Sequence, residues 1–150
     1  MDLLLWRHAE AADGAPDGAR ELTARGRKQA RAVARWLAKR LPGDCRVLVS
    51  PAARAQQTAA ALDLPVTTDS RIDVGASAHD VLAAAGWPDG GGTVLVVGHQ
   101  PTLGQAAALA LTGTASAWSV KKGALWWLRR RERGGERECV LRAVIGPDLV

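Results

Sequence analysis

Short apolar runs of strand length alternate along the chain with amphipathic stretches. Residues 2–6 (DLLLW), 46–49 (RVLV) and 93–98 (TVLVVG) are nearly continuous apolar runs. Runs of this kind are typical of strands that are covered on both faces. A shorter segment, 65–68, predicts one more strand. These four segments indicate the central sheet of an α/β protein.

Between these runs the apolar residues recur at helical spacing. Thr23 is a suitable N-cap for a helix that continues to about Arg40. Its apolar side consists of Ala30, Val33, Ala34, Leu37 and Leu41. Segments 52–62, 77–85 and 101–111 predict three further helices, with Pro51 in the first turn of one and Ser77 as the cap of another. Residues 9–21, rich in Gly, Asp and Pro, predict a loop.

The C-terminal part has a different pattern. Residues 124–131 and 138–145 predict two strands around the turn Gly134-Gly135, which is an antiparallel hairpin. We therefore expect a three-layer α/β sandwich with a mostly parallel central sheet and an antiparallel C-terminal hairpin at one edge. No repeat and no long linker divides the chain, so we expect one domain over residues 1–150.

Composition narrows the possible functions. Of 150 residues, 47% are hydrophobic and 23% charged, and no apolar run approaches the length of a membrane span. The net charge is +5, but aromatic residues are scarce, all six are Trp, and no aromatic-rich basic strand of the kind that stacks bases is visible. Two distant cysteines indicate no disulfide framework. We expect a cytoplasmic monomer without a nucleic-acid or membrane partner.

Polar side chains follow three of the predicted strands. Arg7 and His8 end the first, Ser50 and Arg54 follow the second, and His99 follows the buried strand 93–98. In an open parallel sheet ligands bind beyond the carboxyl ends of the strands, so these groups are expected to meet there. Each short motif alone is more often structural than catalytic. Together, two guanidinium groups and two imidazoles predict a site for a phosphate dianion.

Two histidines in a phosphate site suggest a mechanism. A neutral imidazole can attack phosphorus and form a phosphohistidine, which water then hydrolyses. The arginines and a second, protonated histidine would spread the charge of the transferred group. The sequence offers no carboxylate cluster typical of a Mg²⁺ site, and we expect neither metal nor cofactor.

At these residues the sequence resembles the histidine phosphatase superfamily, and most of all its small SixA-type phosphohistidine phosphatases. The R-H-G motif corresponds to residues 7–9, with Ala9 replacing Gly. The L-T-x-x-G-x-x-Q-A motif corresponds to 22–30, S-P-x-x-R-A-x-Q-T-A to 50–59 and G-H-x-P to 98–101. The motifs occur in the family's order, and no usable motif follows Thr112.

The resemblance implies a phosphoglycerate-mutase-like fold. It implies His8 as the nucleophile and Arg7, Arg54 and His99 as the catalytic phosphate pocket. The substrate it implies is a histidine-phosphorylated protein. Ala9 adds a methyl group beside the nucleophile, which we expect the loop to tolerate.

One departure from the family concerns the proton donor. Members that cleave phosphate esters usually carry an acidic donor after the third strand, whereas only 25 residues separate Thr67 from Thr93 here. Glu10, Asp73 and Asp80 are candidates, although the sequence favours a solvated loop acid for each. Absence of a donor suits a phosphoramidate, because imidazole leaves phosphorus more readily than an alkoxide. The short segment also leaves no lid, which suits a protein substrate.

Alternatives remain at this level. The chain could be a phosphomonoesterase for a small metabolite, or a phosphoprotein-binding module without turnover. Arg20 is either a further anion contact or a solvated side chain. Four basic residues that follow one another at intervals of four positions form a stripe on one helix face: Arg27, Arg31, Arg35 and Lys39. This stripe is either a docking site for an acidic protein or a solvated helix face.

Overall fold

A six-stranded sheet forms the centre of the protein, which we describe from a computed structural model of residues 1–150. Its strand order is β3-β2-β4-β1-β5-β6. The strands are β1 (Asp2–Arg7), β2 (Arg46–Val49), β3 (Thr67–Thr68), β4 (Thr93–Gly98), β5 (Leu125–Arg133) and β6 (Glu136–Ile145). The first four pair in parallel, and β5 and β6 are antiparallel. The predicted fold class is confirmed.

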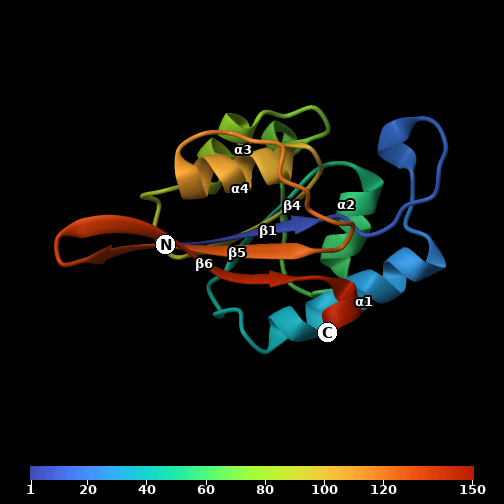
Figure 1. Cartoon of the computed structure of the whole chain (residues 1–150). Coiled ribbons are helices and arrows are strands. Elements are labelled where there is room, and N and C mark those ends of the chain that lie inside the picture. The colour runs from blue at the N-terminus through green and yellow to red at the C-terminus, as the bar shows by residue number, and fades with distance from the viewer.

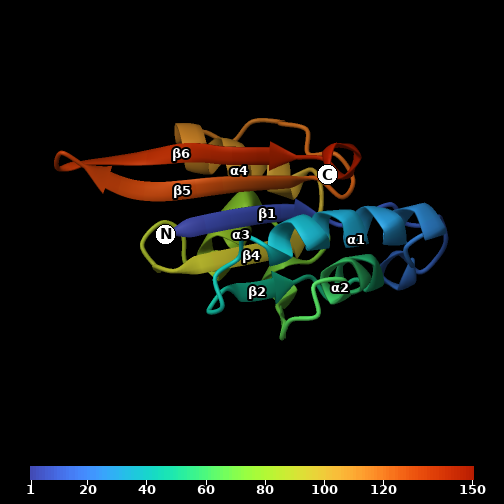
Figure 2. The same cartoon turned by 90° about the horizontal axis from the view of Figure 1, so that it is seen from below.

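The helices cover both faces of the sheet. They are α1 (Ala24–Ala38), α2 (Ala53–Ala60), α3 (Ala78–Ala85) and α4 (Thr102–Thr112). Side chains alternate along a strand, so Leu3 and Leu5 of β1 pack with α3 and α4, while Leu4 and Trp6 pack with α1 and α2. These three layers are visible in Figures 1 and 2. The alternation gives two apolar cores, one on each side.

The predicted helix caps are present. The Thr23 side chain accepts a hydrogen bond from the Gly26 amide, and Ser77 forms a reciprocal capping box with Asp80. The buried side of α1 consists of the predicted residues Ala30, Val33, Ala34 and Leu37, together with Gly26. Helical spacing and the Thr23 cap therefore located this helix and most of its inner face, although the helix ends at Ala38 and the predicted Leu41 lies beyond it.

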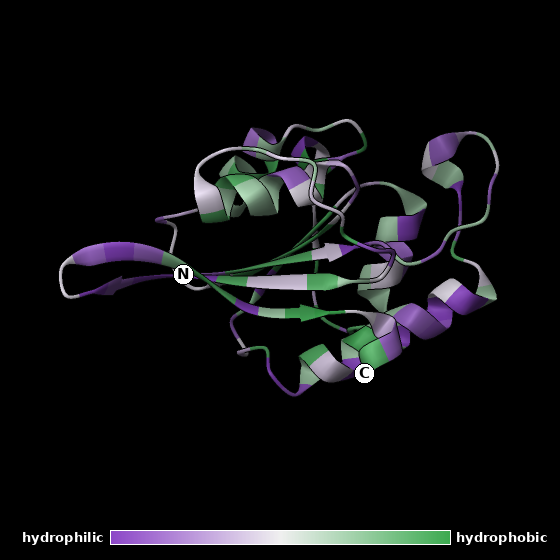
Figure 3. Cartoon of the chain, in the orientation of Figure 1, coloured by the Kyte–Doolittle hydropathy of each residue, from purple (hydrophilic) through white to green (hydrophobic).

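Several element boundaries differ from the prediction. Pro51 lies before α2, whose N-cap is Ala52, and not in its first helical turn. The third strand has only two residues, Thr67 and Thr68. The hairpin strands are longer than predicted and meet at the Gly134-Gly135 turn, because cross-strand pairing continues through charged residues that show no apolar alternation. Figure 3 shows this distal part as hydrophilic. No helix has the length and apolar character needed to cross a bilayer.

Candidate active site

The carboxyl ends of the parallel strands bring the predicted site residues together. The backbone amide of His8, just after β1, donates to the Gly98 carbonyl at the end of β4 (3.0 Å). The Ser50 amide, just after β2, donates to the Val97 carbonyl (3.1 Å). His8, Ser50 and His99 therefore leave the sheet at one edge, where Arg54 of α2 donates a hydrogen bond to the His8 ring.

The His8 ring is buried and its tautomer is determined by its partners. Nδ1 lies 2.8 Å from the Ala9 carbonyl oxygen, which can only accept, so Nδ1 carries the proton. Nε2 accepts a hydrogen bond from Arg54 Nε at 3.3 Å. Burial, followed by the nearby cations Arg54 and Arg7, lowers the pKa of His8 to about 3. The ring is therefore neutral near pH 7, with the lone pair on Nε2.

Arg54 is held between two loops. Its Nη1 donates to the Asp17 carbonyl (2.8 Å) and its Nη2 to the Asp17 carboxylate (3.0 Å), while Nε contacts His8. The side chain is 5% exposed. A guanidinium group has five N–H donors, so two of them have no partner within the chain. These contacts fix the plane of the guanidinium group next to His8 Nε2.

Two buried side-chain nitrogens in the chain have no hydrogen-bond partner, and both belong to predicted site residues. They are Arg7 Nε and His99 Nδ1. Arg7 is otherwise anchored through Nη1 to the Val120 carbonyl (2.9 Å). Buried polar atoms without partners are rare, and they are commonly found where a ligand binds. Both orphaned atoms belong to one cluster, since the His8 and His99 rings are 5.2 Å apart and the charge of Arg7 lowers the pKa of both rings.

His99 is oriented by Ser50 and Asp73. Its Nε2 lies 2.8 Å from Ser50 Oγ. The hydroxyl donates its hydrogen to Asp73 Oδ1 (3.2 Å) and accepts from the Ala52 amide (3.2 Å). Nε2 of His99 must therefore donate, which leaves Nδ1 unprotonated in the neutral ring.

Protonation of His99 depends on its surroundings. Burial lowers its pKa to about 4, and the charge of Arg54 adds to this effect, while Asp73 and Asp17 oppose it. A dianion against Nδ1 would favour the charged ring, because an opposite charge nearby raises the pKa of an imidazole. On anion binding, His99 Nδ1 can thus take up a proton and become a second hydrogen-bond donor of the ring.

Contacts from α1 and α2 hold the loop that follows His8 in place. Thr58 of α2 is fully buried, and its hydroxyl accepts from the Ala9 amide (3.0 Å) and donates to the Arg54 carbonyl (2.7 Å). Gln29 of α1 accepts from the Glu10 amide (3.0 Å). A Cβ at Gly26 would overlap the Glu10 carbonyl oxygen, so α1 can approach this loop only with glycine there. These motif residues position the loop that follows His8.

Sequence reasoning missed two parts of the site. Asp17, in the 3₁₀ helix η1 (Asp17–Ala19), binds both Arg54 and Arg20. Residues 120–124 cover the end of β1, where Gly123 donates its amide to the His8 carbonyl (3.1 Å). Neither carries a local signal, apart from the Gly-Asp-Pro-rich composition of the first loop. Both contacts depend on how distant segments meet.

The acidic candidates have other partners. The Glu10 carboxylate accepts from the Thr23 hydroxyl (2.9 Å) and lies 3.7 Å from Arg25. Asp80 caps α3 by accepting from the Ser77 amide (3.0 Å). Arg20 binds Asp17 and the Ala12 carbonyl. No group of three or more His, Cys, Asp and Glu side chains is placed to hold a metal ion.

Comparison with known proteins shows the family to which this fold belongs. The family model for the histidine phosphatase superfamily (branch 1) matches residues 3–74. The chain is 36% identical over 117 residues to an uncharacterized protein of Mycobacterium tuberculosis, covering 74% of each protein. It is 35% identical to the phosphohistidine phosphatase SixA of Escherichia coli, covering 69% of this chain and 70% of that protein. The chain belongs to the histidine phosphatase superfamily and is a SixA-like hydrolase of it.

Solved structures give the same relationship. The protein histidine phosphatase SixA in complex with tungstate superimposes with a TM-score of 0.83 at 28% identity, over 99% of this chain and 98% of that one. A mycobacterial glucosyl-3-phosphoglycerate phosphatase, at 22% identity and a TM-score of 0.68, shares the fold. The fold thus serves phosphatases of both proteins and small molecules.

Proposed function

We propose that the protein removes the phosphoryl group from phosphohistidine on a protein, through a covalent phosphohistidine at its own His8. Arg7, Arg54 and His99 would bind the phosphoryl oxygens. The observation that carries this proposal is the pair of orphaned buried nitrogens, Arg7 Nε and His99 Nδ1, beside the Nε2 lone pair of His8, which faces Arg54 Nε at 3.3 Å. Arg7 Nε is an unpaired donor, and His99 Nδ1 becomes one when the ring is protonated, so both would be available for the oxygens of the transferred group.

The reaction would consist of two displacements. First, the Nε2 lone pair of His8 forms a bond to phosphorus while the P–N bond of the substrate breaks. The leaving electron pair stays on the substrate imidazole, which takes a proton from water. A water oxygen then attacks phosphorus, the pair of the Nε2–P bond returns to His8, and phosphate leaves with the remaining protons of water shared between it and solvent. The neutral state of His8 suits the first step.

The candidate acids are hydrogen-bonded within the protein, which favours a phosphoramidate over a phosphate ester as the substrate. Glu10, Asp73 and Asp80 are each hydrogen-bonded within the scaffold. Hydrogen bonds from Arg54 and Arg20 lower the pKa of Asp17, so it is ionised and a poor proton donor. An alkoxide needs such a donor, whereas an imidazole leaves without strong assistance. The identity of SixA as a phosphohistidine phosphatase points to the same substrate class.

Phosphate release from a histidine-phosphorylated carrier protein tests the proposal. Wild type and His8→Ala are compared with EDTA present, and p-nitrophenyl phosphate serves as the ester substrate. We expect rapid release by wild type only, slow ester turnover, and a loss on the order of 10⁴-fold in the variant. An acid-labile, alkali-stable phosphoenzyme in wild type would identify the phosphohistidine.

Other results would replace the proposal. Efficient ester hydrolysis with an untouched phosphoprotein would indicate a metabolite phosphatase. Tight phosphoprotein binding without turnover would indicate a binding module. Loss of activity in EDTA, with recovery on adding a divalent metal, would contradict the predicted metal independence.

A further inference from the structure

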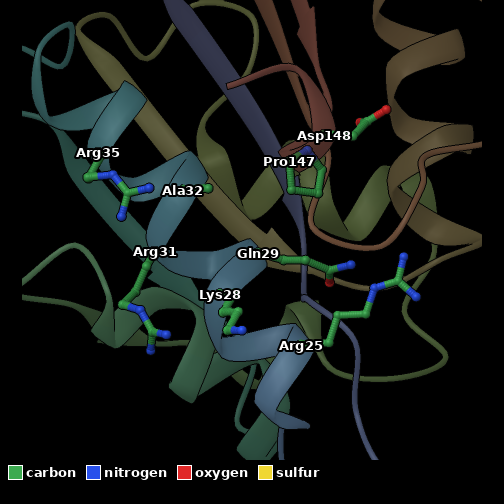
Figure 4. Close-up of a pocket in the computed structure, with 8 residues that line it drawn as sticks. All are labelled: Arg25, Lys28, Gln29, Arg31, Ala32, Arg35, Pro147 and Asp148. Carbon is green, nitrogen blue, oxygen red and sulfur yellow. The ribbon is translucent and has the colours of Figure 1, made fainter.

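A hollow on the surface runs along α1, outside the site described above. It lies between this helix and the 3₁₀ helix η3 (Pro147–Leu149), and its volume is about 490 Å³. Figure 4 shows the side chains that line it. They are Arg25, Lys28, Gln29, Arg31, Ala32, Arg35, Pro147 and Asp148. We name this hollow the α1 trough.

The cations of the α1 trough are not neutralised by the protein. Lys28, Arg31 and Arg35 have no carboxylate oxygen within 4.0 Å, and Arg25 reaches only Glu10, at 3.7 Å. The sequence of α1 contains no acidic residue. Like charges three and four residues apart repel each other. Repulsion between these cations therefore destabilises the fold slightly, and no acidic residue of α1 offsets it.

The single acid of the α1 trough does not offset this charge. The Asp148 carboxylate folds back against the Gly146 backbone, and it forms no ion pair with α1. In Figure 4 it points away from the row of basic side chains. The trough thus presents a positive surface to solvent.

A second hollow, of about 250 Å³, extends the α1 trough along the helix. It shares Ala32 and Arg35 with the first and adds apolar surface from Trp36 and Val150. Lys39 and Arg40 continue the basic wall. The combined surface has a small apolar floor beside a row of cations, which is complementary to a protein face that carries acidic and a few apolar side chains.

The α1 trough begins next to the phosphate site. Gln29, which lines it, accepts from the amide of Glu10, two residues after His8. Gly123, whose amide binds the His8 carbonyl, faces Gln29 and Pro147. α1 starts at the carboxyl edge of the sheet and runs back beneath it (Figures 1 and 2). A partner whose phosphorylated side chain enters the site can therefore reach the trough.

We propose that the α1 trough docks the phosphorylated protein substrate through an acidic face beside its phosphohistidine. This inference rests on the proposed function and specifies how the partner is selected. A nucleic acid is less suited, because the Trp36 ring already stacks with Arg40 (4.2 Å to the ring centroid) and packs edge-on with Trp127, so it is not displayed as a platform for a base. Exposed charges next to a site accelerate encounter with a complementary partner more than they strengthen a small ligand's binding.

The test compares two charge reversals of equal size. Arg31→Glu/Arg35→Glu alters the α1 trough, and Arg133→Glu/Arg137→Glu alters exposed arginines of the distal hairpin by the same net charge. With an acidic histidine-phosphorylated carrier protein we expect the first variant to lose about tenfold in kcat/KM, mainly through KM. Its turnover of p-nitrophenyl phosphate should stay within twofold of wild type, and the hairpin variant should match wild type on both substrates.

Ionic strength gives a second readout. Raising salt from 50 to 300 mM should lower the wild-type kcat/KM on the carrier severalfold and remove most of the difference from the trough variant. Equal losses in the two variants, or no loss in either, would overturn the docking proposal. So would trough-dependent binding to duplex DNA or phosphatidylserine vesicles with unchanged carrier kinetics. A wild-type protein that hydrolyses the ester but never the carrier would instead overturn the proposed function.

Discussion

The protein has two basic regions that use arginine in opposite ways. At the carboxyl edge of the sheet, Arg54 is buried and each of its nitrogens is hydrogen-bonded, one of them to His8. Along α1, Arg31 and Arg35 are exposed and have no partner. A buried guanidinium group must have a fixed geometry to offset its desolvation, whereas an exposed one remains mobile and screened by salt. The first region is suited to orient a reacting group, and the second to attract a partner.

The C-terminal hairpin shows that exposed arginines of this protein do not lack partners in general. Arg129 and Arg142 both bind the carboxylate of Asp2, and Arg131 binds Glu138. Burial raises the pKa of Asp2, but the hydrogen bonds from Arg129 and Trp127 outweigh it, so the net shift is downward. Here the cations fasten β5 and β6 to β1. Free cations on α1 therefore require a separate explanation.

The largest effect is expected from Arg54. Arg54→Ala removes the donor to His8 and the link to Asp17, so kcat/KM should fall by about 10² to 10³ on phosphoprotein and ester alike. Arg54→Lys should recover little, because one ammonium group cannot reach His8 and both Asp17 oxygens. Steady-state kinetics on the two substrates check this. A lysine variant with wild-type rates would contradict the assigned geometry.

The buried imidazoles should make stability depend on pH, which the exposed cations of α1 should not. The pKa of His8 is about 3 and that of His99 about 4 in the folded protein, against about 6.5 when unfolded. Between pH 7 and pH 5 the unfolded chain takes up protons that the folded chain does not. Each ring contributes about 2 kcal/mol or slightly less, so the free energy of unfolding should fall by about 3 to 4 kcal/mol over this range.

Urea unfolding at both pH values measures this change. His8→Asn should reduce the pH dependence, since one of the two titrating groups is gone. An identical pH dependence in wild type, His8→Asn and His99→Asn would show that neither ring is buried in its neutral form.

A smaller effect is expected from Ser50, which acts on His99 and not on the substrate. Ser50→Ala removes the acceptor for His99 Nε2 and the link to Asp73, so kcat/KM should fall about tenfold. Asp73→Asn keeps a side-chain oxygen but loses the charge that raises the pKa of His99. Both variants should shift the alkaline limb of the pH profile to lower pH. A uniform loss at every pH would instead indicate a purely structural role.

The smallest effect concerns stability at the α1 trough. Arg31→Gln/Arg35→Gln removes mutually repelling charges from an exposed helix face, so the free energy of unfolding should rise or stay within about 0.5 kcal/mol. Urea unfolding at low salt checks this. A loss of more than about 1 kcal/mol would mean that these side chains stabilise the fold, and it would weaken the contrast with Arg54.

Much of the architecture could be predicted because local signals report it. Continuous apolar runs located β1, β2 and β4, and helical spacing with Thr23 and Ser77 as caps located α1 and α3. The shared direction of the parallel strands was enough to expect Arg7, His8, Arg54 and His99 at one edge. The length of β3 was overestimated, because only Thr67 and Thr68 of the predicted segment 65–68 pair with β2. The length of the hairpin strands was underestimated, because their distal pairs are charged and show no alternation of apolar and polar residues.

Contacts between distant segments could not be predicted. Three sets of contacts join residues that are 23 to 115 positions apart or lie on irregular loops. They are the ion pair of Asp17 with Arg54, the hydrogen bonds of Ser50 with Asp73 and His99, and the hydrogen bond from the Gly123 amide to the His8 carbonyl. Such contacts depend on loop paths that no local periodicity encodes. The basic stripe illustrates the same limit, since its spacing was visible but its lack of internal partners was not.

The sequence by itself determined the strands, the helices and the four side chains at the sheet edge, because apolar periodicity and strand direction are local properties. The tertiary structure decided which nitrogen of His8 holds the proton, which atoms of Arg7 and His99 are left without partners, and which cations of α1 remain unpaired. These outcomes depend on burial and on atoms brought from far along the chain. Proton positions and electrostatic compensation are properties of the packed molecule, and no local pattern in the sequence contains them.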